Sequence, residues 1–179
     1  LYEAQSPDSM YRVTVADVNG CEASDTVRVT FDLWDLGLST VESPVTACLL
    51  SGQEKIRILA INIGTHAIQN DTVVLTAQVN AGSPVQMQQI ITGLVEPGDS
   101  VSFEFPHDFD LSRTGQHLIQ IMSEFRKDND PLNDTLITAI NHYGIPDPDL
   151  GTGSDSLVID LPYMLDAGEG YASYLWNGS

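Results

Sequence analysis

Apolar and polar residues alternate along most of this 179-residue chain, with the period of two that is typical of β-strands burying one face. Tyr11, Val13 and Val15 alternate with Arg12 and Thr14. No stretch shows the spacing of an amphipathic helix. The same alternation predicts further strands at 27–31, 55–61, 72–79, 85–92, 100–105, 116–123, 135–141, 156–161 and 172–176.

Clusters of Gly, Asn, Asp and Pro separate these strands and favour tight turns. They lie at 18–20, 62–65, 80–82, 96–99 and 128–134. Short strands at this spacing predict an all-β fold of antiparallel sheets, arranged as immunoglobulin-like β-sandwich modules in tandem.

Two segments divide the chain in this prediction. Residues 34–44 and the Pro- and Gly-rich stretch 143–153 (YGIPDPDLGTG) are predicted linkers, because proline cannot donate ladder hydrogen bonds. Residues 45–142 have the length of one sandwich. The flanks, 1–33 and 154–179, are each too short to bury a core alone. The sequence opens without Met or an apolar leader, so we expect a piece of a longer or processed chain.

The charge excludes several classes of partner. Asp and Glu total 25 against 7 Lys and Arg, which gives a net charge of -18. Such a surface repels nucleic acid and anionic membranes, and no apolar run is long enough to insert into a bilayer. The simpler interpretation of the acidic excess is that it keeps the chain hydrated and soluble. The alternative is that clustered carboxylates bind a cation.

Two acidic loops carry the calcium hypothesis. Asp128, Asp130 and Asp134 form one group, with Asn129 and Asn133 beside them. The other loop offers Asp17, Asn19 and Asp25, together with Glu22. Calcium is bound by six to eight oxygens, and these loops supply oxygen ligands. Calcium is the only cofactor that the sequence suggests. Turns closed by Asp and Asn side chains explain the same residues without a metal.

Catalytic motifs are missing from the sequence, and we expect no enzyme activity. There is no GxSxG, HExxH, P-loop or dinucleotide fingerprint. Asp110, Ser112 and His117 lie on one short segment, where a base cannot easily sit between a nucleophile and an acid.

Short sequence motifs in all three segments resemble modules of large secreted Bacteroidetes-type surface proteins. The central segment is similar to CARDB-like immunoglobulin-type domains in DLGLSTVESPVTACLLSGQEKIRILAINIGTHAI, VNAGSPV, VEPGDSVSFEF, DLSRTGQH and DNDPLNDT. The first, MYRVTVADVNGCEASDTVRV, resembles the closing half of a PKD-like module, and LDAGEGYASYLWNGS resembles its opening half.

This resemblance implies an exported, cell-surface protein of the gliding-adhesin or type IX secretion cargo kind. Export predicts a disulfide between Cys21 and Cys48. It also predicts O-glycosylation at sites of the form Asp-Ser/Thr-apolar, although Asp-Thr is equally a way for a turn to enter a strand. The six sites are Ser9, Thr26, Thr72, Ser100, Thr135 and Ser156.

The function we expect is a structural repeat unit of an extracellular fibre or adhesin stalk. The two flanking halves would join head to tail between copies, with Trp176 as a core aromatic opposite Tyr11, Val13 and Val15. One alternative is a module that binds surface glycans through exposed aromatic residues. Another is an accessory domain of a secreted hydrolase.

Overall fold

The computed structural model describes residues 9–30, 32–148, 150 and 164–177. These residues form an all-β fold of antiparallel strands, with one 3₁₀ turn and no α-helix among them. The predicted fold class is confirmed at this level. In chain order the elements are β1 (Ser9–Ala16), β2 (Glu22–Val29), β3 (Leu36–Ser43), β4 (Arg57–Asn62), β5 (Asp71–Val79), β6 (Val85–Ile91), β7 (Ser100–Glu104), β8 (Gly115–Phe125), η1 (Pro131–Asn133) and β9 (Thr135–His142).

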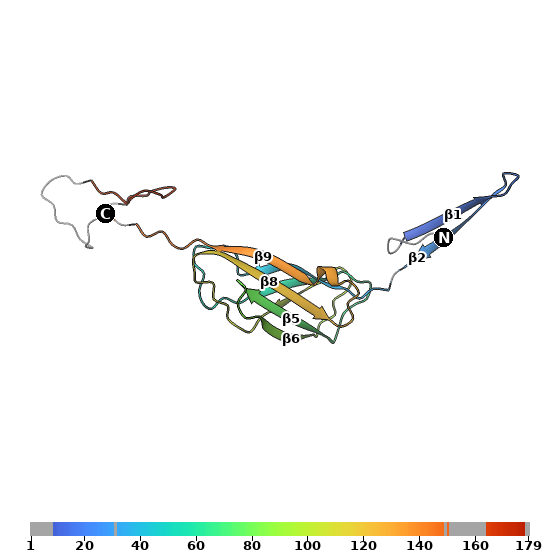
Figure 1. Ribbon diagram of the computed structural model, residues 1–179, viewed down its shortest axis with the longest axis horizontal. Coiled ribbons are helices and arrows are strands. Elements are labelled where there is room, and N and C mark those ends of the chain that lie inside the picture. The colour runs from blue at the N-terminus through green and yellow to red at the C-terminus, as the bar shows by residue number, and fades with distance from the viewer. Residues whose placement is uncertain (1–8, 31, 149, 151–163, 178–179) are drawn as a thin grey trace.

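Strands β3 to β9 form two antiparallel sheets that enclose one hydrophobic core, and we refer to them as the β3–β9 unit (Figure 1). One sheet has the order β3-β4-β7 and the other has the order β6-β5-β8-β9. The core is built mainly from branched aliphatic and phenylalanine side chains. Its largest fully buried members include Leu36, Ile56, Ile58, Ile68, Leu75, Phe105, Leu111, Ile119 and Ile121.

Strand β8 shows how the alternation produces this core. Every second side chain from His117 to Phe125 is buried, and the residues between them face outward. Ile119 and Ile121 are fully buried, since they lie between the two sheets. The six strands predicted between residues 55 and 141 are all found, with ends within a few residues of the prediction.

The predicted linker at 34–44 is wrong, because residues 36–43 form strand β3. This strand pairs with β4, from Leu36 opposite Asn62 to Ser43 opposite Arg57. Its register shifts twice, between Leu38 and Thr40 and between Val41 and Ser43. Each shift breaks the period of two, so the alternation that marks the other strands is lost here.

The chain enters and leaves the β3–β9 unit at opposite ends. It enters near the β8–β9 loop, where the backbone N–H of Leu36 donates to Asp128. It leaves after His142, which pairs with Gly115 and forms a parallel bridge to Ala47. Figure 1 shows the β1–β2 hairpin beyond the entry end and residues 164–177, which we call the C-terminal segment, beyond the exit end.

Candidate functional site

Most apolar side chains of the β1–β2 hairpin lie on one side, and Met10 is on the other. Directly opposed residues of an antiparallel pair share a face, and the register places Tyr11 opposite Val27. Arg12 lies on the other side, where it donates to Ser24. We call the apolar side the hairpin face. It comprises Tyr11, Val13, Val15, Ala23, Val27 and Val29, together with Asp25, which lies opposite Val13.

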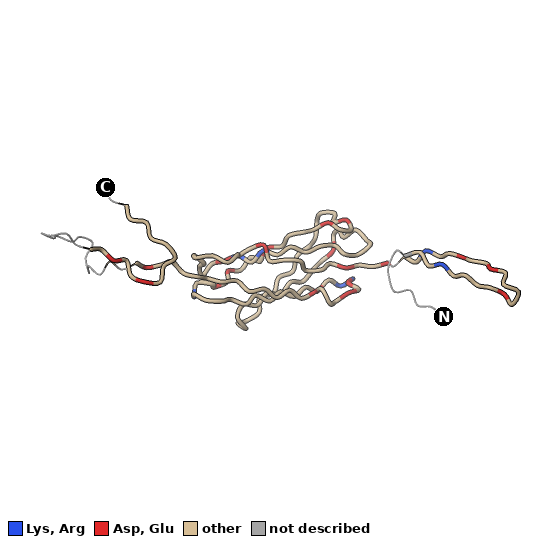
Figure 2. Tube along the Cα trace, turned by 90° about the horizontal axis from the view of Figure 1, so that it is seen from above, with Lys and Arg blue, Asp and Glu red and all other residues tan. Residues whose placement is uncertain are grey.

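The hairpin face is open to solvent. Val13, Val15 and Val27 are 58%, 59% and 58% exposed, respectively. An isolated two-stranded hairpin is marginally stable in water, and both of its edges present unpaired backbone groups. Figure 2 shows the two arginines of the hairpin near its base and its acidic residues toward the tip. The hairpin therefore has the features of an element that is completed by a partner.

A carboxylate shapes the turn of this hairpin. Oxygen Oδ1 of Asp17 accepts the backbone N–H groups of Cys21 at 2.9 Å and of Asn19 at 2.8 Å. The bond from Cys21, followed by those from Asn19, lowers the pKa of Asp17 below 3.8. Gly20 completes the turn at φ 80°, a conformation that favours glycine.

The C-terminal segment is the second exposed apolar element. Trp176 is 53% exposed and Leu175 is 86% exposed, so the expectation of a core position for Trp176 is not met within this chain. Residues 172–176 are not a strand, contrary to the prediction, because no neighbouring strand pairs with them among the described residues. The predicted strand at 156–161 lies outside the described residues.

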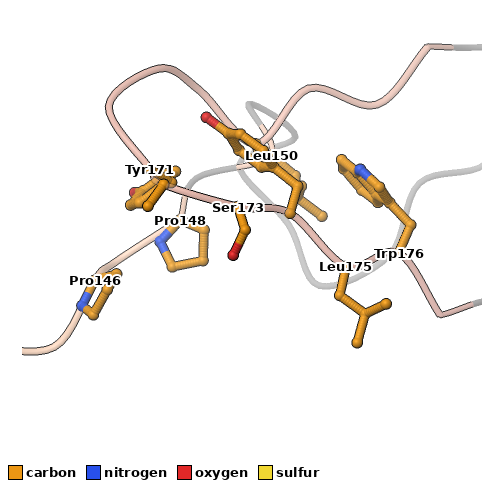
Figure 3. Close-up of a pocket in the computed structure, with 10 residues that line it drawn as sticks. Pro146, Pro148, Leu150, Tyr171, Ser173, Leu175 and Trp176 are labelled. Atoms are coloured by element: carbon orange, nitrogen blue, oxygen red, sulfur yellow. The ribbon is translucent and has the colours of Figure 1, made fainter.

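Contacts of Tyr171 and its neighbours fold this segment back on residues 146–148 and Leu150. The hydroxyl of Tyr171 donates to the carbonyl of Asp147 at 2.9 Å, and the rings of Tyr171 and Tyr174 meet edge to face. Figure 3 shows the side chains around the resulting recess, of about 480 Å³. Besides these tyrosines it is lined by Pro146, Pro148, Leu150, Ala167, Ala172, Ser173, Leu175 and Trp176.

Four carboxylates gather at the entry end of the β3–β9 unit, and we call them the acidic cluster. They are Asp35, Asp128, Asp130 and Asp134. Burial raises the pKa of Asp35 and of Asp134 above 3.8, and the negative charges of Asp128 and Asp130 add to both shifts. Asn133 donates to Asp35 at 2.8 Å and partly offsets the shift there.

In the acidic loop that was predicted to bind calcium, several carboxylate oxygens already accept hydrogen bonds from backbone N–H groups. Asp128 accepts the N–H of Leu36 at 2.9 Å through Oδ2 and that of Asp130 at 2.8 Å through Oδ1. Asp130 accepts from Leu132, and Asp134 accepts the hydroxyl of Ser123. These bonds attach the entering chain to the β8–β9 loop.

The second predicted calcium loop is spread along the hairpin. Asp17 and Asn19 lie in its turn, whereas Asp25 lies within β2 opposite Val13. No group of three His, Cys, Asp or Glu residues within the described part of the chain is arranged to hold a metal ion. Calcium binding at either loop remains a prediction.

The raised pKa values give the acidic cluster an expected pH dependence. Between 3.8 and the raised pKa, the folded protein binds more protons than the unfolded chain, so stability falls as the pH rises through this interval. We expect Asp35→Asn with Asp134→Asn to increase the free energy of unfolding at pH 7, and the gain to shrink as the pH falls through the raised pKa values toward 3.8. Urea unfolding at a series of pH values between 7 and 4 measures this difference.

Asp110→Asn is the control with the opposite sign. The hydroxyl and the backbone N–H of Ser112 lower the pKa of Asp110. Its contribution is present above 3.8 and is lost as the pH falls through the lowered pKa, so this variant is expected to be less stable at pH 7. Equal pH profiles for the double variant and the wild type would contradict the raised pKa values of Asp35 and Asp134.

The predicted Cys21–Cys48 disulfide is absent, and both cysteines are free and exposed. Cys21 follows the hairpin turn, whereas Cys48 lies beside Ala47 at the exit end of the β3–β9 unit. The unit itself therefore separates the two thiols. Sequence position alone could not show this, since it carries no information on which end of a sheet each cysteine reaches.

The predicted glycosylation positions differ in their exposure. Thr26, Ser100 and Thr135 are exposed, and Thr72 is partly buried. Ser9, Ser100 and Thr135 each begin a strand, which agrees with the interpretation that Asp-Ser/Thr marks the entry from a turn. Ser156 lies outside the described residues.

Trp34 and the segment from Asp110 to His117 are both occupied by internal contacts. The ring of His66 stacks on Trp34 at a centroid distance of 4.7 Å, and Lys127 Nζ lies 4.1 Å from the centre of the indole. Trp34 therefore lacks the open face that sugar stacking needs. The hydroxyl of Ser112 donates to Asp110 at 2.6 Å, while His117 contacts Asn80 and the Arg113 carbonyl, so these residues are not arranged as a triad.

Neither a family model nor a curated protein matches this chain. Within the described residues there is no helix with the length and hydropathy to cross a membrane. Sequence analysis did not identify the acidic cluster as a whole, because Asp35 lies more than ninety residues from its neighbours. It also did not recognise β3.

Proposed function

We propose that this chain is a structural unit of an extracellular fibre or adhesin stalk, in which copies join head to tail. The observation that carries the proposal is the pair of exposed apolar elements at opposite ends of the β3–β9 unit. The hairpin face lies beyond the entry end, and the aromatic C-terminal segment lies beyond the exit end. Large apolar surfaces of this kind mark sites of association.

The strand order supports an immunoglobulin-like sandwich for the β3–β9 unit. If β3 to β9 are lettered A, B, C, C′, E, F and G, the sheets have the orders A-B-E and C′-C-F-G. Greek-key arrangements with these neighbours occur in many cell-surface domains. A unit entered at one end and left at the other transmits tension along its length, which suits a module placed in series.

In the proposed joint, residues 172–176 of one copy add to an edge of the hairpin of the next copy. An extended segment directs alternate side chains to one side, so Tyr174 and Trp176 would both cover the hairpin face. The added strand would satisfy unpaired backbone groups at the hairpin edge, as in other cases of strand addition. The same contact can link tandem repeats of one chain or separate subunits.

A surface location agrees with the charge and with the exposed Asp-Ser/Thr sites. The net charge of -18 keeps neighbouring fibres hydrated, and Thr26 and Ser100 are accessible to a glycosylating enzyme. Export and O-glycosylation are parts of the proposal that follow from the resemblance.

Glycan binding is the second candidate function, and the recess in Figure 3 favours it. Tyr171, Tyr174 and Trp176 line the recess, and aromatic rings of this kind stack on sugars. A glycan array separates the two functions, because specific glycan binding that is lost in Trp176→Ala supports the recess as a ligand site.

Two variants with complementary defects test the joint. Val13→Lys places a charge on the hairpin face, and Trp176→Ala removes the central aromatic of the C-terminal segment. We expect each variant alone to associate at least tenfold more weakly than the wild type, since aromatic anchors contribute about 2 kcal/mol or more to interfaces. The wild type should form linear oligomers of increasing length as concentration rises, measured by light scattering and sedimentation.

An equal mixture of the two variants should form dimers and nothing longer. The intact C-terminal segment of Val13→Lys can engage the intact hairpin of Trp176→Ala, but every other joint is defective. Val18→Lys is the matched control, because Val18 lies fully exposed at the hairpin turn and outside the hairpin face. A wild type that stays monomeric at millimolar concentration, or a Val13→Lys variant that assembles like the control, would refute the joint.

A further inference from the structure

The outer face of the four-stranded sheet is almost free of charge, and we call it the lateral face. Its side chains alternate with the buried ones along β5, β6, β8 and β9. Glu124 is the only charged residue among them, in a chain of net charge -18. The lateral face comprises Thr72, Val74, Thr76, Gln78, Gln86, Gln88, Ile90, Gln116, Leu118, Gln120, Met122, Glu124, Thr135, Ile137, Ala139 and Asn141.

The other sheet does not share this property. Its outer face carries Glu42, Arg57 and Glu104, one on each of its three strands. Arg57 lies 3.6 Å from Glu42, so this face presents charges of both signs. The lack of charge on the lateral face is therefore a property of one sheet and not of the unit as a whole.

Exposed apolar side chains form the centre of the lateral face. Ile137 is 58% exposed and lies opposite Gln120, while Leu118 is 49% exposed and lies opposite Ala139. Met122 extends this apolar strip along β8. Single exposed apolar residues are ordinary, but a contiguous strip across two paired strands is a feature of interaction surfaces.

Amide groups surround the apolar strip and have unused hydrogen-bonding capacity. The side chains of Gln86, Gln88 and Gln120 have no hydrogen-bond partner within the described part of the chain. Each amide both donates and accepts, so one amide-rich surface is complementary to another of the same kind. An amide-rich face is therefore suited to pair with a copy of itself.

We propose that the lateral face binds the same face of a second copy, side by side. Two molecules of charge -18 repel each other wherever carboxylates meet, whereas this face brings only one carboxylate of each copy, that of Glu124, to the contact. A two-fold arrangement places the apolar strips together and lets amides pair with amides. The face has no aromatic ring for a sugar and no basic residue for an acidic partner.

The size of the face indicates a weak contact for a single pair. Four strands about 4.8 Å apart, over about seven residues of 3.3 Å each, cover roughly 450 Å² per copy. This is below the roughly 800 Å² per partner of a stable complex, so we expect a dissociation constant on the order of 0.1 mM or weaker. Along a fibre the contact would repeat, and many weak contacts together would hold two fibres in parallel.

Sedimentation equilibrium of the full chain tests this contact in the Val13→Lys background. That substitution disables the hairpin joint, so the lateral contact and the proposed function can fail separately. We expect a monomer–dimer equilibrium that strengthens between 50 and 500 mM NaCl (about 14 to 4 Å Debye length), since salt screens the repulsion between copies. Attraction between opposite charges would weaken over the same range.

Leu118→Glu and Ile137→Glu should each weaken the dimer at least tenfold. Leu94→Glu is the matched control, because Leu94 is 55% exposed in the loop between β6 and β7 and lies outside the lateral face. It adds the same charge and should leave the dimer within about twofold of the parent. The proposal is overturned if the parent stays monomeric near 1 mM in 500 mM NaCl, or if Leu118→Glu and Leu94→Glu have equal effects.

Discussion

Asn62→Ala is expected to destabilise the β3–β9 unit by about 3 kcal/mol. The side chain of Asn62 is fully buried at the end of β4. Its Nδ2 group donates to the carbonyl of His66 at 2.7 Å and to that of Val95 at 2.8 Å, while Oδ1 accepts the N–H of Gly64 at 3.1 Å. Alanine removes all three bonds and leaves buried polar groups without partners, each of which costs about 1–3 kcal/mol.

Urea unfolding followed by circular dichroism measures this loss. Asn141→Ala is the control, because Asn141 is only half-buried and its side chain makes no hydrogen bond to the described residues. That change should cost less than about 0.5 kcal/mol. If both variants unfold at the same urea concentration, Asn62 does not hold the loops around β4 together as its bonds indicate.

Phe105→Ala is expected to have the largest effect of any single substitution considered, about 4 kcal/mol. Phe105 follows β7, is fully buried, and meets the ring of Phe109 edge to face at a centroid distance of 5.9 Å. Truncation to alanine removes apolar contacts and leaves a cavity between the sheets, which costs about 3–5 kcal/mol for phenylalanine. Domains are stable by only about 5–15 kcal/mol, so this change removes a large share of the total.

Thermal and urea unfolding of Phe105→Ala, compared with two milder changes, test the origin of the effect. Phe105→Leu keeps most of the volume and should cost roughly 1 kcal/mol. Leu94→Ala shortens an exposed side chain and should be nearly neutral. A Phe105→Ala variant as stable as Leu94→Ala would show that the core packs differently from the arrangement described.

These two substitutions also separate stability from assembly. Both act inside the β3–β9 unit, whereas the hairpin face, the C-terminal segment and the lateral face are all exposed. Under conditions where the unit remains folded, Asn62→Ala should therefore still join head to tail. Val13→Lys should leave the unfolding of the unit unchanged, because Val13 is 58% exposed and belongs to the hairpin.

The sequence by itself determined the strands that follow a strict period of two. In β8, burial of His117, Ile119 and Ile121 on one side is a direct consequence of alternate side chains pointing to opposite faces. The turn of the hairpin was equally predictable, because Asp17 and Gly20 form it through contacts within five residues. Its second strand was placed at 27–31, whereas β2 already begins at Glu22. Local chemistry is sufficient for features of this kind.

Tertiary structure alone decided which distant residues meet. Strand β3 was missed because two register shifts disrupt its alternation, and only pairing with β4 reveals it. Asp35 joins Asp128 and Asp134 because the β8–β9 loop folds over the start of β3. The pKa of a carboxylate depends on burial and on charges a few ångströms away, neither of which sequence spacing specifies.

The same distinction explains the cysteines and the lateral face. Cys21 and Cys48 are close in sequence, but the β3–β9 unit places them at opposite ends. The lateral face draws its residues from four strands spread over seventy positions, and none of those strands is unusual alone. Its lack of charge becomes visible only when β5, β6, β8 and β9 lie side by side, because a sheet face is a property of strand order and not of any one strand.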